Sequence, residues 1–257
     1  MGATLWLYWE GPRPPYVQLC LDLLLAFNPD SRLLGPAEIH AVRPPLPVDV
    51  DRLTVLHRSD YMRSHYLLHF GGIYCDADCI PLKPFGAVYD MARNSPGGFC
   101  GYDSTDNTIG ANFMASVSGG PVIARQYNII TNNVRIKERL EWLDVSSVPM
   151  TQAVREVGRD RCVILPERLI QPVRWSAMDQ MFVHRSDEDH AGYYVPEAFC
   201  YMLSNQCLGE RARSMSRGDL LESDYFFSFL FRNALANLRV RGEDIPYAKG
   251  SADTEPL

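Results

Sequence analysis

The sequence lacks long hydrophobic runs, paired cysteine motifs and a recognisable secretory leader. No apolar run approaches the roughly 20 residues that span a bilayer, and residues 1–6 lack a basic region followed by an apolar one. The seven cysteines are odd in number, contain no Cys-x-x-Cys pair and have no histidine spacing suited to zinc, so we expect no disulfide framework. We therefore expect a cytoplasmic protein, and peripheral attachment to the inner face of a membrane stays open.

The sequence also lacks a basic stripe and a low-complexity linker. Its formal net charge of -6 and its pI near 5.5 would repel a nucleic-acid backbone, so we expect no nucleic-acid partner. The 257 residues, 46% hydrophobic and 22% charged, are typical of a globular chain. We predict a main domain over residues 1–218, a C-terminal helix packed on it over 219–248, and a flexible tail over 249–257.

Short apolar runs alternate along the chain with segments rich in helix formers. This alternation predicts an α/β fold in which helices flank a Rossmann-like, mostly parallel central sheet. One helix is expected to begin at Ser59, which can cap a first turn that contains Asp60, and to end at Gly71-Gly72. The expected strands are 4–9, 73–75, 98–102, 111–117 and 162–165, and the other expected helices are 16–27, 121–141, 150–157 and 220–238.

Two aspartates, Asp76 and Asp78, follow the expected buried strand 73–75. They are two residues apart, so in an extended chain both carboxylates leave on the same face. Open α/β sheets bind ligands beyond the carboxyl ends of their strands, where two carboxylates can hold Mg²⁺ or Mn²⁺ together with a diphosphate. The pattern alone also fits an aspartate-rich turn that bonds its own backbone.

The segment before these aspartates makes the pattern more specific. Ser59-Asp60-Tyr61-Met62-Arg63 is followed, after seven residues, by Gly71-Gly72-Ile73-Tyr74-Cys75-Asp76-Ala77-Asp78. This block resembles the signature S-D-x-x-R-x(7)-G-G-I-Y-x-D-x-D of retaining glycosyltransferases with a DXD motif, and every fixed position is filled. That group includes capsular polysaccharide synthesis enzymes, yeast-type mannosyltransferases and clostridial glucosylating toxins. Residues 5–12 also resemble the opening strand of the capsular-polysaccharide members.

The resemblance implies a GT-A fold, a nucleotide-sugar donor and transfer with retention of the anomeric configuration. It implies that Asp78 ligates Mn²⁺ or Mg²⁺, and that Asp76 contacts the donor ribose or sugar and helps to hold the ion. Asp60 and Arg63 would contact the sugar hydroxyls and belong to the catalytic group with the two DXD aspartates. The other implied donor contacts are Trp9, stacked on the base, Tyr74, against the nucleoside, and Asn112, at the head of a strand near the donor.

The residue types at these positions agree with the implied roles. Asp60 and Arg63 are three apart on the expected helix and therefore share one face. A carboxylate beside a guanidinium can bind vicinal hydroxyls, because one accepts and the other donates hydrogen bonds. A surface ion pair is the alternative for these two residues. Trp9 and Tyr74 can equally be core aromatics.

The C-terminal half departs from the family pattern. Family members often carry a Y-x-x-H-L-W stretch, whereas the nearest segment here, residues 199–205, has no histidine. Arg211, Arg213 and Arg217 either form a lid over the diphosphate or belong to a solvated loop. The aromatic residues between Tyr225 and Phe231 are expected to pack on the domain, with a membrane-surface or dimer contact as the alternative.

The sequence as a whole predicts a metal-dependent retaining hexosyltransferase. It would move a hexose from a UDP-sugar or, less favoured, a GDP-sugar to a hydroxyl of a saccharide or glycolipid, by analogy in surface polysaccharide synthesis. One alternative is a nucleotide-sugar-binding protein without transfer activity, which the missing histidine favours. A less favoured alternative is a phosphohydrolase of the haloacid-dehalogenase type, which also places D-x-D after a buried strand.

Overall fold

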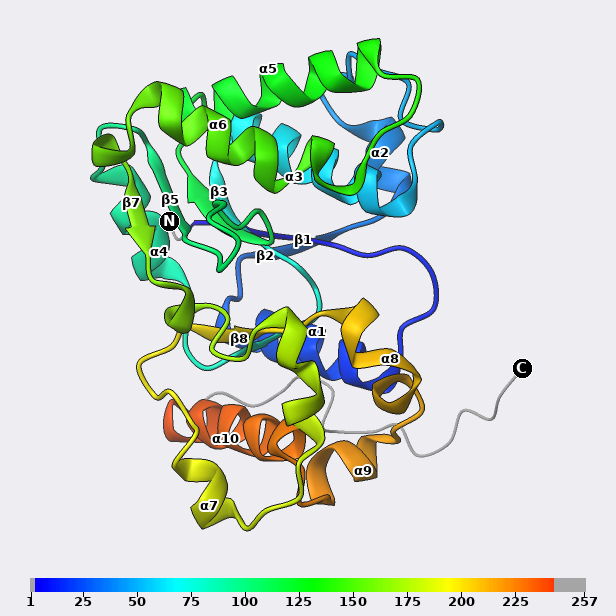
Figure 1. The fold of residues 1–257 in the computed structure, drawn as a ribbon, viewed down its shortest axis with the longest axis vertical. Helices are drawn as coiled ribbons and strands as arrows, with labels where there is room; N and C mark the ends of the chain where they lie inside the picture. The colour runs from blue at the N-terminus through cyan, green and yellow to red at the C-terminus, as the bar shows by residue number, and fades with distance from the viewer. Residues whose placement is uncertain (1–2, 243–257) are drawn as a thin grey trace. The chain divides into compact units, whose positions relative to one another are not determined.

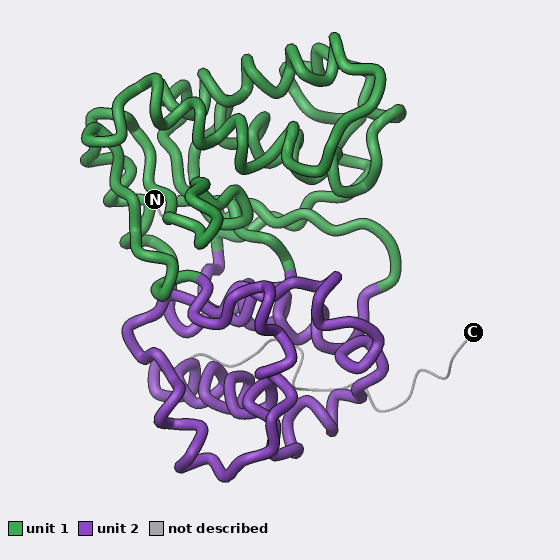
Figure 2. The backbone as a smooth tube through the Cα atoms, viewed as in Figure 1, with its two compact units in different colours: residues 1–12, 30–77, 85–170 green, residues 13–29, 78–84, 171–257 purple. Residues whose placement is uncertain are grey.

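The computed structural model describes residues 3–242, which fall into two compact units (Figure 2). Unit 1 contains the chain up to residue 12 and residues 30–77 and 85–170, and unit 2 contains residues 13–29, 78–84 and the chain from residue 171. Each unit is thus assembled from separated segments of the chain. The domain boundaries expected at residues 218 and 248 stay predictions, and the expected tail over 249–257 lies outside the described residues.

A six-stranded sheet forms the centre of unit 1 (Figure 1). Its strands lie in the order β2-β1-β3-β6-β5-β7. Its neighbouring strands run parallel, apart from β6, which is antiparallel to both β3 and β5. The expected α/β class with a mostly parallel sheet is therefore confirmed. The strands are β1 (Leu5–Tyr8), β2 (Ser31–Leu34), β3 (Gly72–Cys75), β5 (Phe99–Tyr102), β6 (Phe113–Ser116) and β7 (Val163–Leu165).

Helices cover both faces of this sheet. They are α2 (Pro36–Ala41), α3 (Val55–Phe70), α4 (Gly86–Arg93), α5 (Pro121–Ile136) and α6 (Ser147–Val157), with the 3-10 turns η1 (Trp142–Val145), η2 (Arg159–Arg161) and η3 (Glu167–Leu169). Successive side chains of a strand point to opposite faces, so Phe113 and Met114 of β6 separate. Met114 joins the buried core that includes side chains of α3, α5 and α6. Phe113 packs against Phe85, just before α4, with ring centroids 5.0 Å apart.

Helix α3 begins earlier than the sequence analysis expected. Its N-cap is Thr54, whose hydroxyl accepts a hydrogen bond from the His57 amide at 3.2 Å. The expected start at Ser59 is wrong because Thr54 offers the same capping oxygen one turn earlier. Ser59 lies inside the helix instead, where its hydroxyl is 3.0 Å from the hydroxyl of Tyr74.

Two glycines turn the chain from α3 directly into β3. Gly71 and Gly72 have φ angles of 67° and 108°, a region that residues with a Cβ adopt only with strain. A Cβ at Gly72 would also lie 2.4 Å from the carbonyl oxygen of Thr4, just before β1. The double glycine therefore lets β3 follow α3 directly. Asp60 and Arg63 lie on α3, and Tyr74 lies on β3.

Unit 2 combines helices with a small antiparallel sheet. Its elements are α1 (Pro15–Phe27), β4 (Cys79–Pro81), η4 (Trp175–Phe182), α7 (Asp187–Ala191), β8 (Cys200–Met202), α8 (Asn205–Arg213), α9 (Arg217–Glu222) and α10 (Phe226–Val240). Phe226, Phe227, Phe229 and Phe231 of α10 are at most 5% exposed, so these aromatic side chains are buried within unit 2. Among the described helices of both units, none is long and apolar enough to cross a bilayer.

The helix expected over 220–238 is in fact two helices, α9 and α10. The chain leaves the helical conformation at Ser223 and returns to it at Phe226. The Ser223 hydroxyl donates to the carbonyl oxygen of Asp219 at 2.8 Å and lies 2.6 Å from the hydroxyl of Ser228. Such local side-chain bonds compete with a continuous helix, which explains the break.

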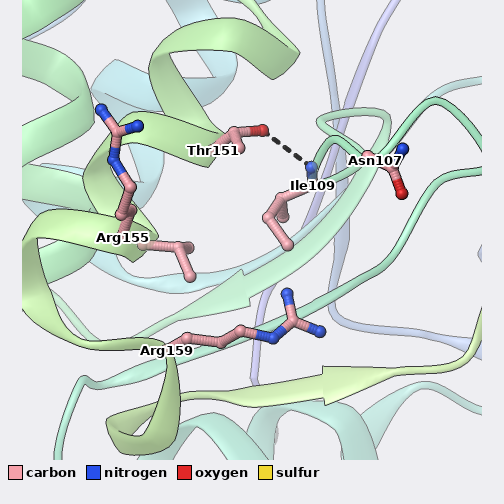
Figure 3. A pocket seen from close by; sticks show the side chains of 6 residues that line it. Asn107, Ile109, Thr151, Arg155 and Arg159 are labelled. Carbon is pink, nitrogen blue, oxygen red and sulfur yellow. Dashed lines mark hydrogen bonds between the residues drawn. The ribbon is translucent and has the colours of Figure 1, made fainter.

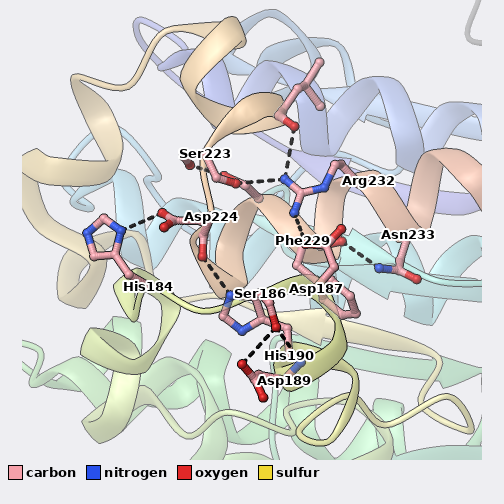
Figure 4. Close-up of polar contacts among 12 residues, drawn as sticks. His184, Ser186, Asp187, Asp189, His190, Ser223, Asp224, Phe229, Arg232 and Asn233 are labelled. Atoms are coloured by element: carbon pink, nitrogen blue, oxygen red, sulfur yellow. Dashed lines mark hydrogen bonds and ion pairs between the residues drawn. The ribbon is translucent and has the colours of Figure 1, made fainter.

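An arginine of α10 ties three helices of unit 2 together (Figure 4). Arg232 donates from Nη1 to the carbonyl oxygens of Leu221 and Ser223 at 3.1 and 2.8 Å. Its Nη2 pairs with the carboxylate of Asp187 in α7. The Arg232 side chain is 30% exposed, so these bonds are partly shielded from water.

We expect Arg232→Met to lower the free energy of unfolding by about 1.5–3 kcal/mol, because charge-assisted hydrogen bonds to three partners are lost. Urea denaturation followed by circular dichroism measures this change. The matched control is Arg93→Met in α4, where Arg93 pairs with Asp90 and both side chains are at least 60% exposed. We expect a change below about 0.5 kcal/mol in the control. Equal losses in the two variants would contradict the assigned role of Arg232.

Candidate active site

Tyr74 and Asp76 stand at the carboxyl end of β3 in unit 1. The Tyr74 hydroxyl donates to Oδ1 of Asp76 at 2.9 Å and is 3.0 Å from the hydroxyl of Ser59. Tyr74 is fully buried, and this burial raises its pKa well above the ordinary tyrosine value. The phenol therefore stays protonated and holds one oxygen of the Asp76 carboxylate.

The guanidinium of Arg63 joins two carboxylates in the interior. Its Nη2 lies 2.6 Å from Oδ1 of Asp60 and 3.2 Å from Oδ1 of Asp76. Its Nη1 donates to the carbonyl oxygen of Ala111, and its central carbon lies 4.5 Å from the centre of the Tyr74 ring. Burial alone would lower the pKa of Arg63, but the two carboxylates raise it above the ordinary arginine value. Arg63 therefore remains a cation.

Asp60 is the most deeply buried carboxylate of this group. It is 2% exposed, and this burial raises its pKa to about 6, against the opposing effect of Arg63. Among the described residues, neither Oδ2 of Asp60 nor Nε of Arg63 has a hydrogen-bond partner. Buried polar atoms normally have partners, so an unpaired acceptor and an unpaired donor stand out in this cluster.

Asn112, the residue just before β6, joins the cluster through its backbone. Its carbonyl oxygen accepts the Asp76 amide at 2.9 Å, and its side-chain Oδ1 accepts the Tyr102 hydroxyl at 2.6 Å. The Asp76 side chain is 30% exposed and is therefore more accessible than the side chain of Asp60. The structure thus brings together five of the predicted residues, namely Asp60, Arg63, Tyr74, Asp76 and Asn112, and their roles toward a donor stay predictions.

Trp9 lies just beyond the end of β1, the strand that pairs with β3. It is half-buried, and its Nε1 contacts the carbonyl oxygens of Gly11 and Pro12 at 3.2 and 3.3 Å. The next residue, Glu10, pairs with Arg58 of α3 at 2.7 Å. This pair attaches the end of β1 to the helix that carries Asp60 and Arg63.

Asp78 belongs to unit 2, so the boundary between the units falls inside the DXD motif. Its Oδ2 accepts the backbone amide of Asn205 at 2.8 Å, and its carbonyl oxygen accepts the amide of Leu203 at 3.0 Å. The segment 199–205, where the family places its histidine, includes β8, which pairs with β4 directly after Asp78. Within this segment, which has no histidine, the backbone of Asn205 contacts the Asp78 carboxylate.

Two side chains hold Asn205, one that the sequence did not single out, Tyr16, and one that it suggested for a lid, Arg213. The Tyr16 hydroxyl donates to its Oδ1, and Nη2 of Arg213 donates to its carbonyl oxygen at 2.8 Å. Of the other arginines considered for a lid, Arg211 stacks on the Phe182 and Tyr225 rings, and Arg217 pairs with Asp22 at 3.5 Å. No local pattern in the sequence indicated Asn205, because its contact with Asp78 joins segments that lie far apart in the chain.

The donor set of the DXD motif fits a hard divalent cation. Carboxylate oxygens suit Mg²⁺ and Mn²⁺, and such ions are often bound by one or two carboxylates together with phosphate oxygens and water. Asp76 and Asp78 are both partly exposed. Within residues 3–242, no cluster of three or more histidine, cysteine, aspartate or glutamate side chains is placed to hold a metal ion.

A separate hollow of about 220 Å³ opens in unit 1 (Figure 3). Its lining includes Asn107, Ile109, Thr151, Arg155 and Arg159 but none of the predicted site residues. The Thr151 hydroxyl accepts the Ile109 amide at 2.8 Å and so ties the loop before β6 to α6. We read this hollow as a consequence of how that loop is anchored.

A comparison with known protein families found a match for residues 46–96. These residues match the model of a family described as "Glycosyltransferase sugar-binding region containing DXD motif". A solved structure described as "PaToxG Glycosyltransferase" is similar over 92% of this chain and 85% of that chain, at 13% sequence identity and a TM-score of 0.46. No curated protein matches the chain. The predicted resemblance to DXD-containing glycosyltransferases is confirmed over residues 46–96.

Proposed function

We propose that the protein is a metal-dependent retaining glycosyltransferase of GT-A type. It moves a hexose from a UDP- or GDP-sugar to a hydroxyl of a saccharide or glycolipid acceptor. One observation carries the proposal: the matched region includes the buried pair of Asp60 and Arg63, bonded to the partly exposed Asp76, and this pair holds an unpaired acceptor and an unpaired donor. Retention, the hexose and a role in surface polysaccharide synthesis rest on the family resemblance.

The unpaired atoms suit a sugar hydroxyl. A hydroxyl group can both donate and accept a hydrogen bond. It can therefore donate a hydrogen bond to Oδ2 of Asp60 and accept one from Nε of Arg63. Both side chains are at most 3% exposed, so binding requires a small local opening around α3. Arg63 also fixes the Asp76 carboxylate, so sugar binding and the orientation of Asp76 depend on the same guanidinium.

Asp78 and Asp76 would hold Mn²⁺ or Mg²⁺ together with the donor diphosphate. The ion, when bound, neutralises charge that grows on the leaving nucleoside diphosphate. The Tyr74 hydroxyl and Arg63 both bind Oδ1 of Asp76 and leave Oδ2 for the ion or the donor. Trp9 would stack on the base and Asn112 would contact the donor. Tyr74 is fully buried, so it would act on the donor through its hydrogen bond to Asp76.

A nucleotide-sugar-binding protein without transfer activity is the second candidate. The observation that favours it is the absence of a histidine from residues 199–205, the segment that reaches Asp78. Donor binding without release of nucleoside diphosphate in the presence of acceptor would identify this function. The match over residues 46–96 favours a sugar-binding region over the phosphohydrolase alternative.

We expect Asp78→Asn to weaken Mn²⁺-dependent donor binding by at least about 10-fold, equivalent to about 1.4 kcal/mol. Asparagine keeps an oxygen for the Asn205 amide but loses the charge that binds the ion. Calorimetric titration of UDP- and GDP-sugars, with and without Mn²⁺, measures the effect. The matched control is Asp90→Asn, an exposed aspartate of α4 that should bind donor as the wild type does. Unchanged metal-dependent binding in Asp78→Asn would rule out the assigned metal ligand.

We expect Arg63→Lys to lower kcat/KM for transfer by about 10²-fold. Lysine keeps the charge, but it lacks the planar fork that reaches Asp60, Asp76 and the Ala111 carbonyl at once. The control is Arg125→Lys in α5, whose arginine pairs with Glu156 at the surface. Release of nucleoside diphosphate measures the rate, and circular dichroism verifies the fold of both variants. Wild-type kcat/KM in a folded Arg63→Lys protein would contradict the role.

A further inference from the structure

A hollow of about 400 Å³ lies between η4 and α8 in unit 2. It is lined by Trp175, Ser176, Met178, Asp179 and Cys207. Ligand pockets for small molecules are commonly about 300–1,000 Å³, so the hollow has room for a sugar ring. Nothing in the proposed donor site uses these residues.

Helix α8 connects this hollow to the DXD motif. Its first residue, Asn205, donates its amide to Oδ2 of Asp78 at 2.8 Å, and Cys207 lines the hollow two residues further along. Two residues of helix rise by about 3 Å, so the hollow begins within one turn of the carboxylate proposed to bind the ion. A sugar held here would lie near the diphosphate end of a donor bound through Asp78.

The side chains of the hollow match the two kinds of surface that a pyranose presents. Trp175 is 46% exposed, which leaves an aromatic face for the C–H face of a sugar ring. Asp179 is exposed and supplies carboxylate oxygens that accept hydrogen bonds from ring hydroxyls, and Ser176 adds a hydroxyl. Met178 is 2% exposed and gives the hollow an apolar floor.

The charge of the side chains that line the hollow favours a neutral acceptor sugar over the negatively charged donor. Among the described residues that line the hollow there is no lysine or arginine, and Asp179 contributes a negative charge. A diphosphate or an acidic sugar would be repelled at this position, because like charges at short range are unfavourable. A neutral sugar meets no such penalty.

We propose that this hollow between η4 and α8 binds a neutral pyranose ring of the acceptor, stacked on Trp175 and hydrogen-bonded to Asp179. The identification of this sugar as the acceptor rests on the proposed function. Binding of a sugar to the hollow can nevertheless be measured without a donor. The aromatic face and the carboxylate act together, so replacement of either side chain weakens the site.

The direct test is saturation-transfer NMR with methyl α-glucoside, methyl α-mannoside, methyl β-galactoside and maltose, without donor. We expect at least one of them to bind the wild type and to lose about 10-fold or more in affinity in Trp175→Ala and Asp179→Asn, with partial recovery in Trp175→Phe. The matched control is Trp142→Ala, because Trp142 is 58% exposed and lies in unit 1. Binding of none of the four sugars, or equal losses in the Trp142 and Trp175 variants, would overturn the inference.

Steady-state transfer kinetics then distinguish the two sources of a sugar ring. We expect Trp175→Ala to raise KM for the acceptor about 10-fold and KM for the donor less than about twofold. A rise in donor KM alone would place the donor sugar in the hollow and refute the acceptor assignment. If sugars bind through Trp175 but no nucleotide-sugar is turned over, the proposed function fails and the sugar site survives.

Discussion

The buried guanidinium of Arg63 is the interaction on which the unit 1 cluster depends. A buried cation is tolerable only when it is paired and hydrogen-bonded, and Arg63 meets this condition with Asp60, Asp76 and the carbonyl oxygen of Ala111. These partners come from α3, from the end of β3 and from the segment before β6. Loss of Arg63 would leave the buried carboxylate of Asp60 and the partly exposed one of Asp76 without their shared cation. The same contact that orders the site therefore also joins three segments of the sheet unit.

The two aspartates of the DXD motif are held in different ways. Asp76 is oriented by side chains, the Tyr74 hydroxyl and the Arg63 guanidinium. Asp78 is held by backbone amides of the returning segment 203–205. A backbone amide imposes no particular side chain, so this support for Asp78 does not depend on the identity of the residue at position 205.

The sequence motif predicted the cluster well because its spacing reflects local geometry. Asp60 and Arg63 share a face of α3, and Gly71-Gly72 brings β3 directly behind that helix, so the contact with Asp76 follows from nearby residues. The start of α3 at Thr54 was missed because two capping residues were available. The Asn205 contact with Asp78 and the Trp175 hollow depend on pairing between distant segments, which local patterns do not specify.

The central claim is that the DXD site activates a nucleotide-sugar with a divalent ion. The most direct measurement is ¹H NMR of the protein incubated with a panel of UDP- and GDP-sugars, with Mn²⁺ or with a chelator, followed by rapid assignment of the released sugar. The account predicts Mn²⁺-dependent release of UDP or GDP from one donor, with the sugar first appearing in its original anomeric configuration. No nucleotide release from any donor, or first appearance of the inverted anomer, would contradict it.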